Sequence, residues 1–334
     1  MTQLSTPPVT VKQALGPLYA GIRPELDRVE ARLRRELRSR HPLVDEVLRH
    51  GLRLGGKRLR PALVLLSGQA AGCIAEEHIV LATVMEMIHT ATLVHDDVLD
   101  EAELRRHVDT VNARWSNETS VLLGDFLFSH SFYLASTIGT ADACRTIGRA
   151  TNTVCDGELR QTLSGGNLEL SEDEYLAIID AKTAELCACC CELGATYAGG
   201  DSVSVERLAS FGRNLGIAFQ IADDLLDVLG HEHETGKSLG TDLAKRKMTL
   251  PLIHARDVLA GNGQREFLDL VRRGDPDDAE AIRRQLEMLG SLDYASSRAR
   301  YYADLAEQDL TVVPACAARE TLGSLAQFAI ARSA

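Results

Sequence analysis

The stretch LVHDDVLDEAELRR, residues 93–106, is the most informative part of this chain of 334 residues. It continues VLATVMEMIHTA, residues 80–91, whose apolar residues predict a helix buried in a protein core. Three carboxylates follow at Asp96, Asp97 and Asp100, and the arginine pair Arg105–Arg106 comes directly behind them. An apolar helix that ends in charges of both signs indicates a polar site at the edge of the core.

The chain repeats this acidic pattern in FQIADDLLDV, residues 219–228, which carries Asp223, Asp224 and Asp227. The first and last aspartates of such a motif share a helix face. Two like charges about 6 Å apart repel by roughly 3 kcal/mol at an effective dielectric of about 20, so the six carboxylates need a cation. Carboxylates with room for water favour Mg²⁺, with Mn²⁺ as the alternative, over zinc. One such motif alone could be a solvated helix end, but the repetition favours a metal site.

The rest of the chain predicts an all-α fold. Apolar residues recur mostly three and four positions apart, which favours helices over strands, and convincing strand patterns are absent. Examples of stretches with this helical spacing are 44–54, 60–72, 77–99, 119–138, 143–164, 173–198, 204–230 and 247–259. Turn-forming clusters separate several of them, namely AGGD (198–201), GNGQ (261–264) and GDPDD (274–278). We expect one large helical bundle over residues 1–334, with a short mobile lead-in at about 1–10 and an outer helical layer from about 280.

Composition excludes several classes of protein. A net charge of −12 argues against a nucleic-acid partner, which would favour a basic face. There is no signal-peptide pattern and no apolar run near the roughly 18–20 residues that cross a bilayer, so we expect a cytoplasmic protein without a transmembrane segment. Four cysteines crowd into ELCACCCELGA at 187, 189, 190 and 191. On a helix they point in different directions, which predicts reduced core residues and no metal site.

Basic residues accompany the acidic motifs. GGKRLRP, residues 55–61, places Lys57, Arg58 and Arg60 after paired glycines and before a helix, an arrangement that favours phosphate binding. His89 and Gln220 lie on the acidic helices, seven residues before Asp96 and three before Asp223 respectively. A lone helical histidine is usually a core residue, but the shared face favours a role for His89 in the polar site.

Taken in order, these motifs resemble those of the trans-isoprenyl (polyprenyl) diphosphate synthases. The resemblance runs from about residue 30 to 330 and rests on GGKRLRP, IHTATLVHDDVLD, RR, GDFLF, KTA, FQIADDLLD, GKSLGTDL and K-TLPLI. It implies a homodimeric bundle of the isoprenoid synthase type around a central cavity. It also implies Mg²⁺-dependent, head-to-tail (1'-4) condensation of isopentenyl diphosphate with an allylic diphosphate, which would be farnesyl, geranyl or dimethylallyl diphosphate.

The resemblance also implies roles for individual residues. The six aspartates would hold the Mg²⁺ ions that bridge the allylic diphosphate. The other residues with an implied role are Arg105, Lys182, Lys247 and Lys237, the last in a mobile loop, for the allylic diphosphate; Lys57, Arg60, His89 and Arg106 for isopentenyl diphosphate; and Lys182, Thr183 and Gln220 for catalysis, the last two near the developing carbocation. This chemistry needs a neutralised leaving group and a dry apolar wall around the cation. Released diphosphate would take the final proton, because no dedicated base stands out.

Two positions depart from the family pattern. The family commonly continues its paired arginines with Gly-x-Pro-Thr, whereas RRHVDT has His107 and Asp109 at those positions. The family also usually has glycine before the lysine of K-TLPLI, where this chain has Arg246. Neither change removes a ligand, so we expect activity, but the backbone that aims Arg105 and Arg106 becomes an open question.

Product length should depend on the residues beneath the first motif. Ala91 and Thr92 lie five and four residues before Asp96, about 6–7.5 Å deeper in the cavity. A bulky aromatic there would stop the chain early, so these small residues predict a product longer than twenty carbons, as for a quinone side chain. The floor would then lie at one of a deeper set of residues, for which plain core packing is the alternative role: Val84, Met87, Ile88, Phe128 or Phe132.

Three alternatives stay open at this point. The same reaction could stop at geranylgeranyl or farnesyl diphosphate, which product sizing would reveal. A class I terpene cyclase shares the fold and the ionisation step but would not require isopentenyl diphosphate. A non-catalytic subunit that regulates a partner synthase would be inactive alone, although such subunits typically lose charged residues that this chain retains.

Overall fold

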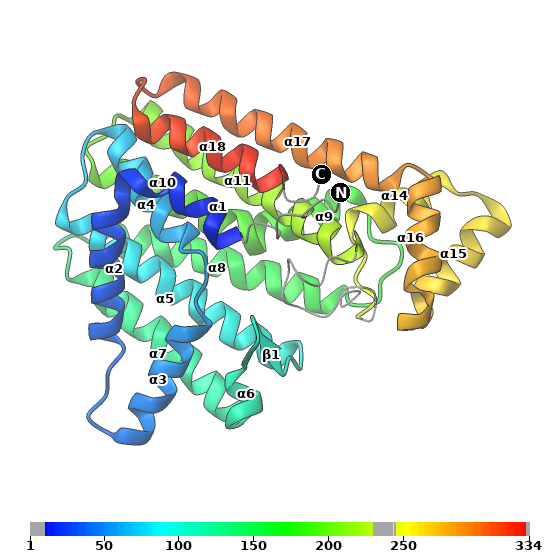
Figure 1. Ribbon diagram of the computed structural model, residues 1–334, viewed down its shortest axis with the longest axis horizontal. Coiled ribbons are helices and arrows are strands. Elements are labelled where there is room, and N and C mark those ends of the chain that lie inside the picture. Colours follow the sequence, from blue (N-terminus) through cyan, green and yellow to red (C-terminus); the bar gives the residue numbers. More distant parts are fainter. Residues whose placement is uncertain (1–10, 230–242, 244, 332–334) are drawn as a thin grey trace, which may run out of the picture.

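The structure, a computed structural model, describes residues 11–229, 243 and 245–331, and these are almost entirely helical (Figure 1). The predicted lead-in at 1–10 lies outside them. The helical elements of the first half are α1 (Val11–Leu18), the 3₁₀ turn η1 (Ala20–Ile22), α2 (Arg23–Glu36), α3 (Pro42–Leu54), α4 (Leu59–Ala71), α5 (Glu76–Leu99), α6 (Val111–Arg114), α7 (Asn117–Ser136) and α8 (Asp142–Leu163). Those of the second half are α9 (Glu172–Ile179), the π-turn η2 (Asp180–Ala184), α10 (Glu185–Tyr197), α11 (Ser202–Leu229), α14 (Leu250–Val258), α15 (Gly261–Arg273), the 3₁₀ turn η3 (Pro276–Asp278), α16 (Ala279–Met288), α17 (Ser291–Asp309), the 3₁₀ turn η4 (Leu310–Val312) and α18 (Ala317–Ala331). The all-α prediction is confirmed.

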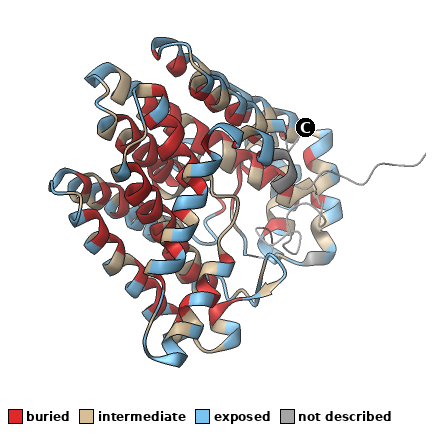
Figure 2. Ribbon diagram, turned by 60° about the vertical axis from the view of Figure 1, so that its left-hand side comes forward, coloured by how far each residue is buried: buried red, intermediate tan, exposed pale blue. Residues whose placement is uncertain are grey.

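Helix α5 runs through the middle of the bundle. It packs against α2, α4, α7 and α10, and it is buried around most of its circumference, as at Val84, Met87 and Ile88. A helix that is apolar on all sides is stable only when other helices surround it. Figure 2 shows the same arrangement for the whole chain, with buried residues along the inner helices and exposed ones on the outer turns.

Small residues bring α10 close to its neighbours α4 and α11. A Cβ on Gly194 of α10 would overlap the Val64 carbonyl of α4, and a Cβ on Gly212 of α11 would lie 2.5 Å from the Cys187 carbonyl. The four cysteines of α10 are buried and form no disulfide, and burial raises the pKa of Cys191 to about 12. The prediction that these four cysteines are core residues is confirmed.

The C-terminal helices cover one side of the bundle (Figure 1). Helix α17 packs on α11 and buries a stripe of alanines, Ala295, Ala299 and Ala303, while α18 packs on α4 and α17. An alanine stripe allows close helix packing without leaving voids. The helical tail expected from about 280 is therefore present.

Four local features differ from the sequence expectations or were not covered by them. A two-stranded hairpin, β1 (Leu104–Arg105) with β2 (Val108–Asp109), follows α5, and its strands are too short to give a sequence pattern. Helix α2 lies outside the stretches given as examples of helices, although its buried residues recur at helical spacing. Gly261, expected in a break, is the first residue of α15. The helix predicted over 173–198 contains the π-turn η2.

Among the described helices, none combines the length and the apolar character that a membrane span would require.

Candidate active site

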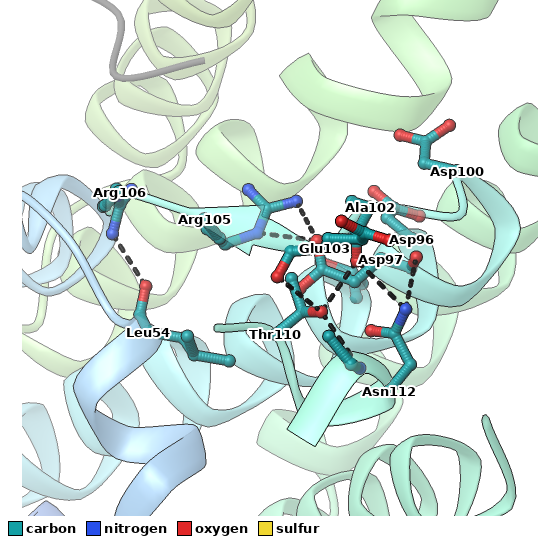
Figure 3. A network of polar contacts seen from close by, with 12 residues as sticks. Leu54, Asp96, Asp97, Asp100, Ala102, Glu103, Arg105, Arg106, Thr110 and Asn112 are labelled. Carbon is teal, nitrogen blue, oxygen red and sulfur yellow. Dashed lines mark hydrogen bonds and ion pairs between the residues drawn. The ribbon is translucent and has the colours of Figure 1, made fainter. Parts of the chain in front are cut away.

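The first aspartate motif lies where α5 ends, with Asp100 as the C-cap residue. Asp97 is only 1% exposed. Its Oδ1 accepts a hydrogen bond from Nε of Arg105 at 2.9 Å and forms an ion pair with Nη2 of the same arginine at 2.7 Å (Figure 3). Burial raises the pKa of Asp97 although Arg105 opposes the shift. Its other oxygen, Oδ2, is buried and has no hydrogen-bond partner among the described residues. The motif therefore retains unused acceptor capacity next to a guanidinium.

The hairpin after α5 sends its two arginines in different directions (Figure 3). Arg105 points back to Asp97, whereas Arg106 donates from Nη1 to the Leu54 carbonyl at 2.8 Å, at the end of α3. Between the strands, Arg106 and His107 form a two-residue turn with φ of 52° and 63°. Two positive φ values are typical of the hairpin turn whose twist matches the strands. This turn is what aims the two arginines at separate places.

Two lysines surround the first motif. Nζ of Lys182, on η2, lies 3.8 Å from Asp96 Oδ2 and 2.9 Å from Glu158 Oε2 of α8. Nζ of Lys245 lies 2.7 Å from Asp100 Oδ1. Burial raises the pKa of both Asp96 and Glu158, and Lys182 partly offsets this. The acids and lysines thus form a crowded, partly desolvated cluster.

The second motif lies in the last turns of α11. Asp224 is 2% exposed, and its Oδ2 accepts from the Tyr175 hydroxyl at 2.7 Å. Its Oδ1 accepts from Gln220 Nε2 at 2.8 Å and lies 3.4 Å from Lys247 Nζ. Gln220 Oε1 accepts in turn from the Thr183 hydroxyl at 2.9 Å. The structure therefore joins Thr183, Gln220, Asp224 and Lys247 in one hydrogen-bonded row.

That row separates the aspartates of the second motif by environment. Asp223 and Asp227, the other two members, are each partly exposed on the same helix. The oxygens of Asp224 accept hydrogen bonds from Tyr175 and Gln220, and these bonds hold the carboxylate in place. All three aspartates of the motif lie on neighbouring turns at the end of α11.

A second basic group surrounds His89. Burial lowers the pKa of His89 well below its ordinary value, and nearby Arg60, Arg106, Arg105 and Arg58 lower it further. The imidazole is therefore neutral and able to accept or donate a hydrogen bond among cations. Nε of Arg60 is buried without a hydrogen-bond partner among the described residues. Such a set of guanidinium groups is suited to an anionic ligand such as a phosphate.

The loop of GGKRLRP places its glycines against arginines. A Cβ on Gly55 would overlap the Arg58 guanidinium, and a Cβ on Gly56 would overlap that of Arg106. The glycines thus make room for arginines, and the predicted phosphate contact of this loop stays a prediction. Arg58, with φ of 55°, makes ion pairs with Glu30 and, at 2.5 Å, with Glu86, which is 2% exposed. It is an internal structural cation.

The remaining predicted residues fall as follows. Nζ of Lys57 lies 6.0 Å from the ring centroid of Phe219, one residue before Gln220. Ala91 is fully buried and Thr92 partly exposed, on the turn of α5 beneath Asp96. Lys237 and its predicted mobile loop lie outside the described residues. The structure thus brings the other predicted polar residues to one end of the bundle.

Sequence reasoning missed Glu158 and Lys245. Glu158 follows Gly157, whose missing Cβ lets α8 approach Ala181 and Lys182 closely. Lys245 stands beside Lys247 in KRKMTLP, and only the three-dimensional contact with Asp100 distinguishes it from a surface lysine. For Glu158, the only signal in the sequence was its position directly after a glycine within a helical stretch.

The donor set fits Mg²⁺. The acids are hard oxygen ligands, and Asp97 Oδ2 is buried without a hydrogen-bond partner among the described residues. Burial, together with repulsion from neighbouring carboxylates, raises the pKa of Asp96 and of Asp97. Among the described residues, no three acidic, histidine or cysteine side chains converge closely enough to hold an ion alone. Oxygens of a ligand would then complete the shell, which is common for Mg²⁺.

Comparison with known proteins gives consistent results. The family model described as polyprenyl synthetase matches residues 41–289. The octaprenyl diphosphate synthase of Haemophilus influenzae is 35% identical over 93% of this chain and 94% of its own. The all-trans-nonaprenyl-diphosphate synthase (geranyl-diphosphate specific) of Rhodobacter capsulatus is 38% identical over 88% and 90%. The crystal structure of a polyprenyl synthase from Caulobacter crescentus, complexed with calcium and isoprenyl diphosphate, superimposes with a TM-score of 0.90 at 36% identity, covering 98% of this chain and all of that one.

Proposed function

Because the chain belongs to the polyprenyl synthetase family, we propose that it is a trans-prenyltransferase that makes a long-chain all-trans polyprenyl diphosphate. It joins isopentenyl diphosphate to an allylic diphosphate, with farnesyl, geranyl or dimethylallyl diphosphate as the primer. The product is longer than twenty carbons. Relatives named for octaprenyl and nonaprenyl products support this length, as do the small residues Ala91 and Thr92.

One observation carries the proposal: the hairpin directs Arg105 to Asp97 and Arg106 to the Leu54 carbonyl (Figure 3), and Arg106 is among the arginines that lower the pKa of His89. Two neighbouring anion sites result: one contains the aspartates of the first motif, whereas in the other the carboxylates of Glu30 and Glu86 are paired with Arg58. The reaction needs this asymmetry, because one diphosphate must leave and the other must stay attached. The acidic site suits the diphosphate that leaves, and the arginine site suits that of isopentenyl diphosphate.

In the acidic site, Lys182, Lys247 and Arg105 bind the allylic diphosphate from three elements. Mg²⁺, when bound by the aspartates, neutralises the negative charge that develops on the leaving diphosphate. The lysines are held by carboxylates now, so they reach the ligand without a large change of position. Lys237 is proposed to join them.

The Thr183–Gln220 pair is joined to this site through the hydrogen bond from Gln220 to Asp224, and the proposed role of its oxygens is to stabilise the atoms that become positive. Lone pairs of these oxygens stabilise the allylic cation without a covalent bond. The apolar residues of α5 exclude water from it. Arg60, His89, Arg106 and Lys57 orient isopentenyl diphosphate so that its double bond meets the cation, and the proton then leaves to the released diphosphate.

We further propose that the chain works as a homodimer through the exposed apolar residues of α7 and α8. The cytoplasmic location stays a prediction from the sequence, which fractionation of cells would test.

The proposal is tested by incubating the purified chain with Mg²⁺, farnesyl diphosphate and isopentenyl diphosphate and sizing the products by chromatography. We expect chain extension that requires isopentenyl diphosphate and is lost on chelation. Release of diphosphate from the primer alone would indicate a terpene cyclase. No turnover by the isolated chain, with activity restored by a partner, would indicate a regulatory subunit. Asp96→Asn is the matched inactive control.

A further inference from the structure

The π-turn η2 interrupts an otherwise continuous helix between α9 and α10. The amide of Glu185 donates to the Asp180 carbonyl five residues earlier, in place of the usual four. Such turns contain one extra residue, are rare and occur frequently at functional sites. Lys182 and Thr183 both lie inside this turn. Their direction therefore depends on the helix keeping the π arrangement.

Arg213 of α11 contacts both ends of the turn. Its Nη1 donates to Asp180 Oδ1 at 2.5 Å, and its Nη2 donates to Glu185 Oε2. These are the two residues whose backbones make the π hydrogen bond. In an α-helix, residues five apart are separated by about 140° around the axis. The i→i+5 hydrogen bond of a π-turn reduces this angle. The π arrangement therefore favours contact of one guanidinium with both carboxylates.

Glycines on both sides leave the turn little room to move. A Cβ on Gly216, three residues after Arg213, would lie 2.5 Å from the Ala184 Cα. A Cβ on Gly157 of α8 would lie 2.8 Å from the Ala181 Cβ. The turn is therefore enclosed between α8 and α11, and Arg213 is a charged residue that contacts both of its ends.

We propose that Arg213 is a positioning residue for prenyl transfer, which maintains the π-turn that brings Lys182 to Asp96 and Glu158 and Thr183 to Gln220. The inference rests on the function proposed above. Arg213 contacts the carboxylates of Asp180 and Glu185, and its side chain is 39% exposed on α11, so it acts through the turn. Without Arg213, the turn would relax to α geometry. The loss of one residue from the turn's register would then rotate the side chains on one side of it by about 100° around the helix axis. Lys182 and Thr183 would then lose their partners.

The test is Arg213→Met, which keeps the length of the side chain and removes its hydrogen bonds. The matched control is Arg207→Met, on the same helix, where an arginine with 53% side-chain exposure pairs with Asp309 at 3.2 Å, away from η2. We expect Arg213→Met to lower kcat/KM for the allylic substrate about tenfold or more, since small displacements of positioned groups have large effects. KM for isopentenyl diphosphate should stay within about twofold of its original value. Equal losses in both variants would overturn the proposal.

Two further variants separate positioning from general stability. Arg213→Lys, whose ammonium can still donate to both carboxylates, should recover part of the lost rate. In a Lys182→Met background, Arg213→Met should have a smaller effect than in the original chain, because its action passes largely through Lys182. Full additivity of the two losses would contradict the inference.

Hydrogen exchange supplies a readout that does not depend on activity. In Arg213→Met, the amides of the peptide that spans residues 181–186 should exchange faster, because the π hydrogen bonds lose the contacts that stabilise them. In Arg207→Met, their exchange rate should not change. Unchanged exchange in Arg213→Met would refute the role of Arg213. If the original chain transfers no prenyl group while this exchange result holds, the proposed function fails and the role of Arg213 in maintaining the turn stands.

Discussion

At the scale of single residues, the departures from the family pattern have a physical meaning. His107 and Arg246 have φ of 63° and 54°, in the left-handed region where a side chain costs roughly 1 kcal/mol or more and glycine does not. They stand where the family that the sequence resembles usually has glycine. The backbone at these two positions therefore adopts a conformation suited to glycine, at a cost in strain energy. The side chains of Arg105 and Arg106 still point to two different places.

This strain is measurable by His107→Gly. The exposed imidazole makes none of the described hydrogen bonds, so the substitution removes strain and little else. The free energy of unfolding should rise by about 0.5–1 kcal/mol after the entropy of an added glycine is deducted. Urea unfolding at fixed pH measures it. The control is Asp109→Gly, in the extended strand β2, which should lower the free energy of unfolding. A lower free energy of unfolding in His107→Gly would contradict the explanation.

Ala91 carries the prediction on product length. It is fully buried one turn beneath the first aspartates, on the helix proposed to wall the cavity. Ala91→Phe should shorten the product, because the ring occupies space that a growing chain needs. Overpacking should also lower stability by about 1–3 kcal/mol. Chromatography should show that the product becomes progressively shorter from Ala91→Val to Ala91→Leu to Ala91→Phe. An unchanged product length in all three variants would refute the assignment.

At the scale of elements, His78 joins the start of α5 to α10. Its Nδ1 accepts from the Ala75 amide at 3.0 Å, so Nε2 carries the proton and donates to the Gly194 carbonyl at 2.9 Å. The ring is fully buried and neutral, and burial lowers its pKa below the ordinary value. A proton added to this ring would disrupt the contact with the Ala75 amide.

The sign of the resulting pH dependence follows from linkage. Below about pH 6.5 the unfolded chain binds a proton at this histidine that the folded chain excludes, so stability falls as the pH falls. His78→Gln keeps a donor for Gly194 and should make the decrease less steep by up to about 1.4 kcal/mol per pH unit. Urea unfolding between pH 7 and pH 5 tests this. His41→Gln, at an exposed histidine, is the control, and equal slopes in all three proteins would contradict it.

The elements also show what the sequence could predict. Helices α5 and α11 were predicted closely because each has a long apolar pattern that ends in a distinctive acidic motif. The π-turn was missed because one extra residue barely disturbs that pattern. Glu158, Lys245 and Arg213 were missed for another reason: each acquires its role from a contact with a residue far away in the chain. Motif spacing identifies ligands on one helix, but it carries no information on such contacts.

At the scale of the whole molecule, α7 leaves an apolar face uncovered. Leu122 is 68% and Tyr133 62% exposed, and Phe126 lies between them on the same helix face. His130 stacks on the rings of both Phe126 and Tyr133, with 5.7 Å between centroids. On α8, which packs against α7, Leu159 and Leu163 are also exposed, four residues apart. A face with so many large apolar side chains is typical of a protein interface.

We therefore expect the double variant Leu122→Glu with Tyr133→Glu to dissociate the proposed homodimer. Two copies would meet through the same face, so each substitution places like charges in the interface twice and removes buried apolar area. The dissociation constant should rise at least about tenfold, which is roughly 1.4 kcal/mol, and analytical ultracentrifugation over a range of concentrations measures it. Met288→Glu is the matched control, because Met288 is 79% exposed on α16 and belongs to neither helix of this face. A chain that sediments as a monomer before substitution, or a double variant that stays dimeric, would rule out this face as the interface.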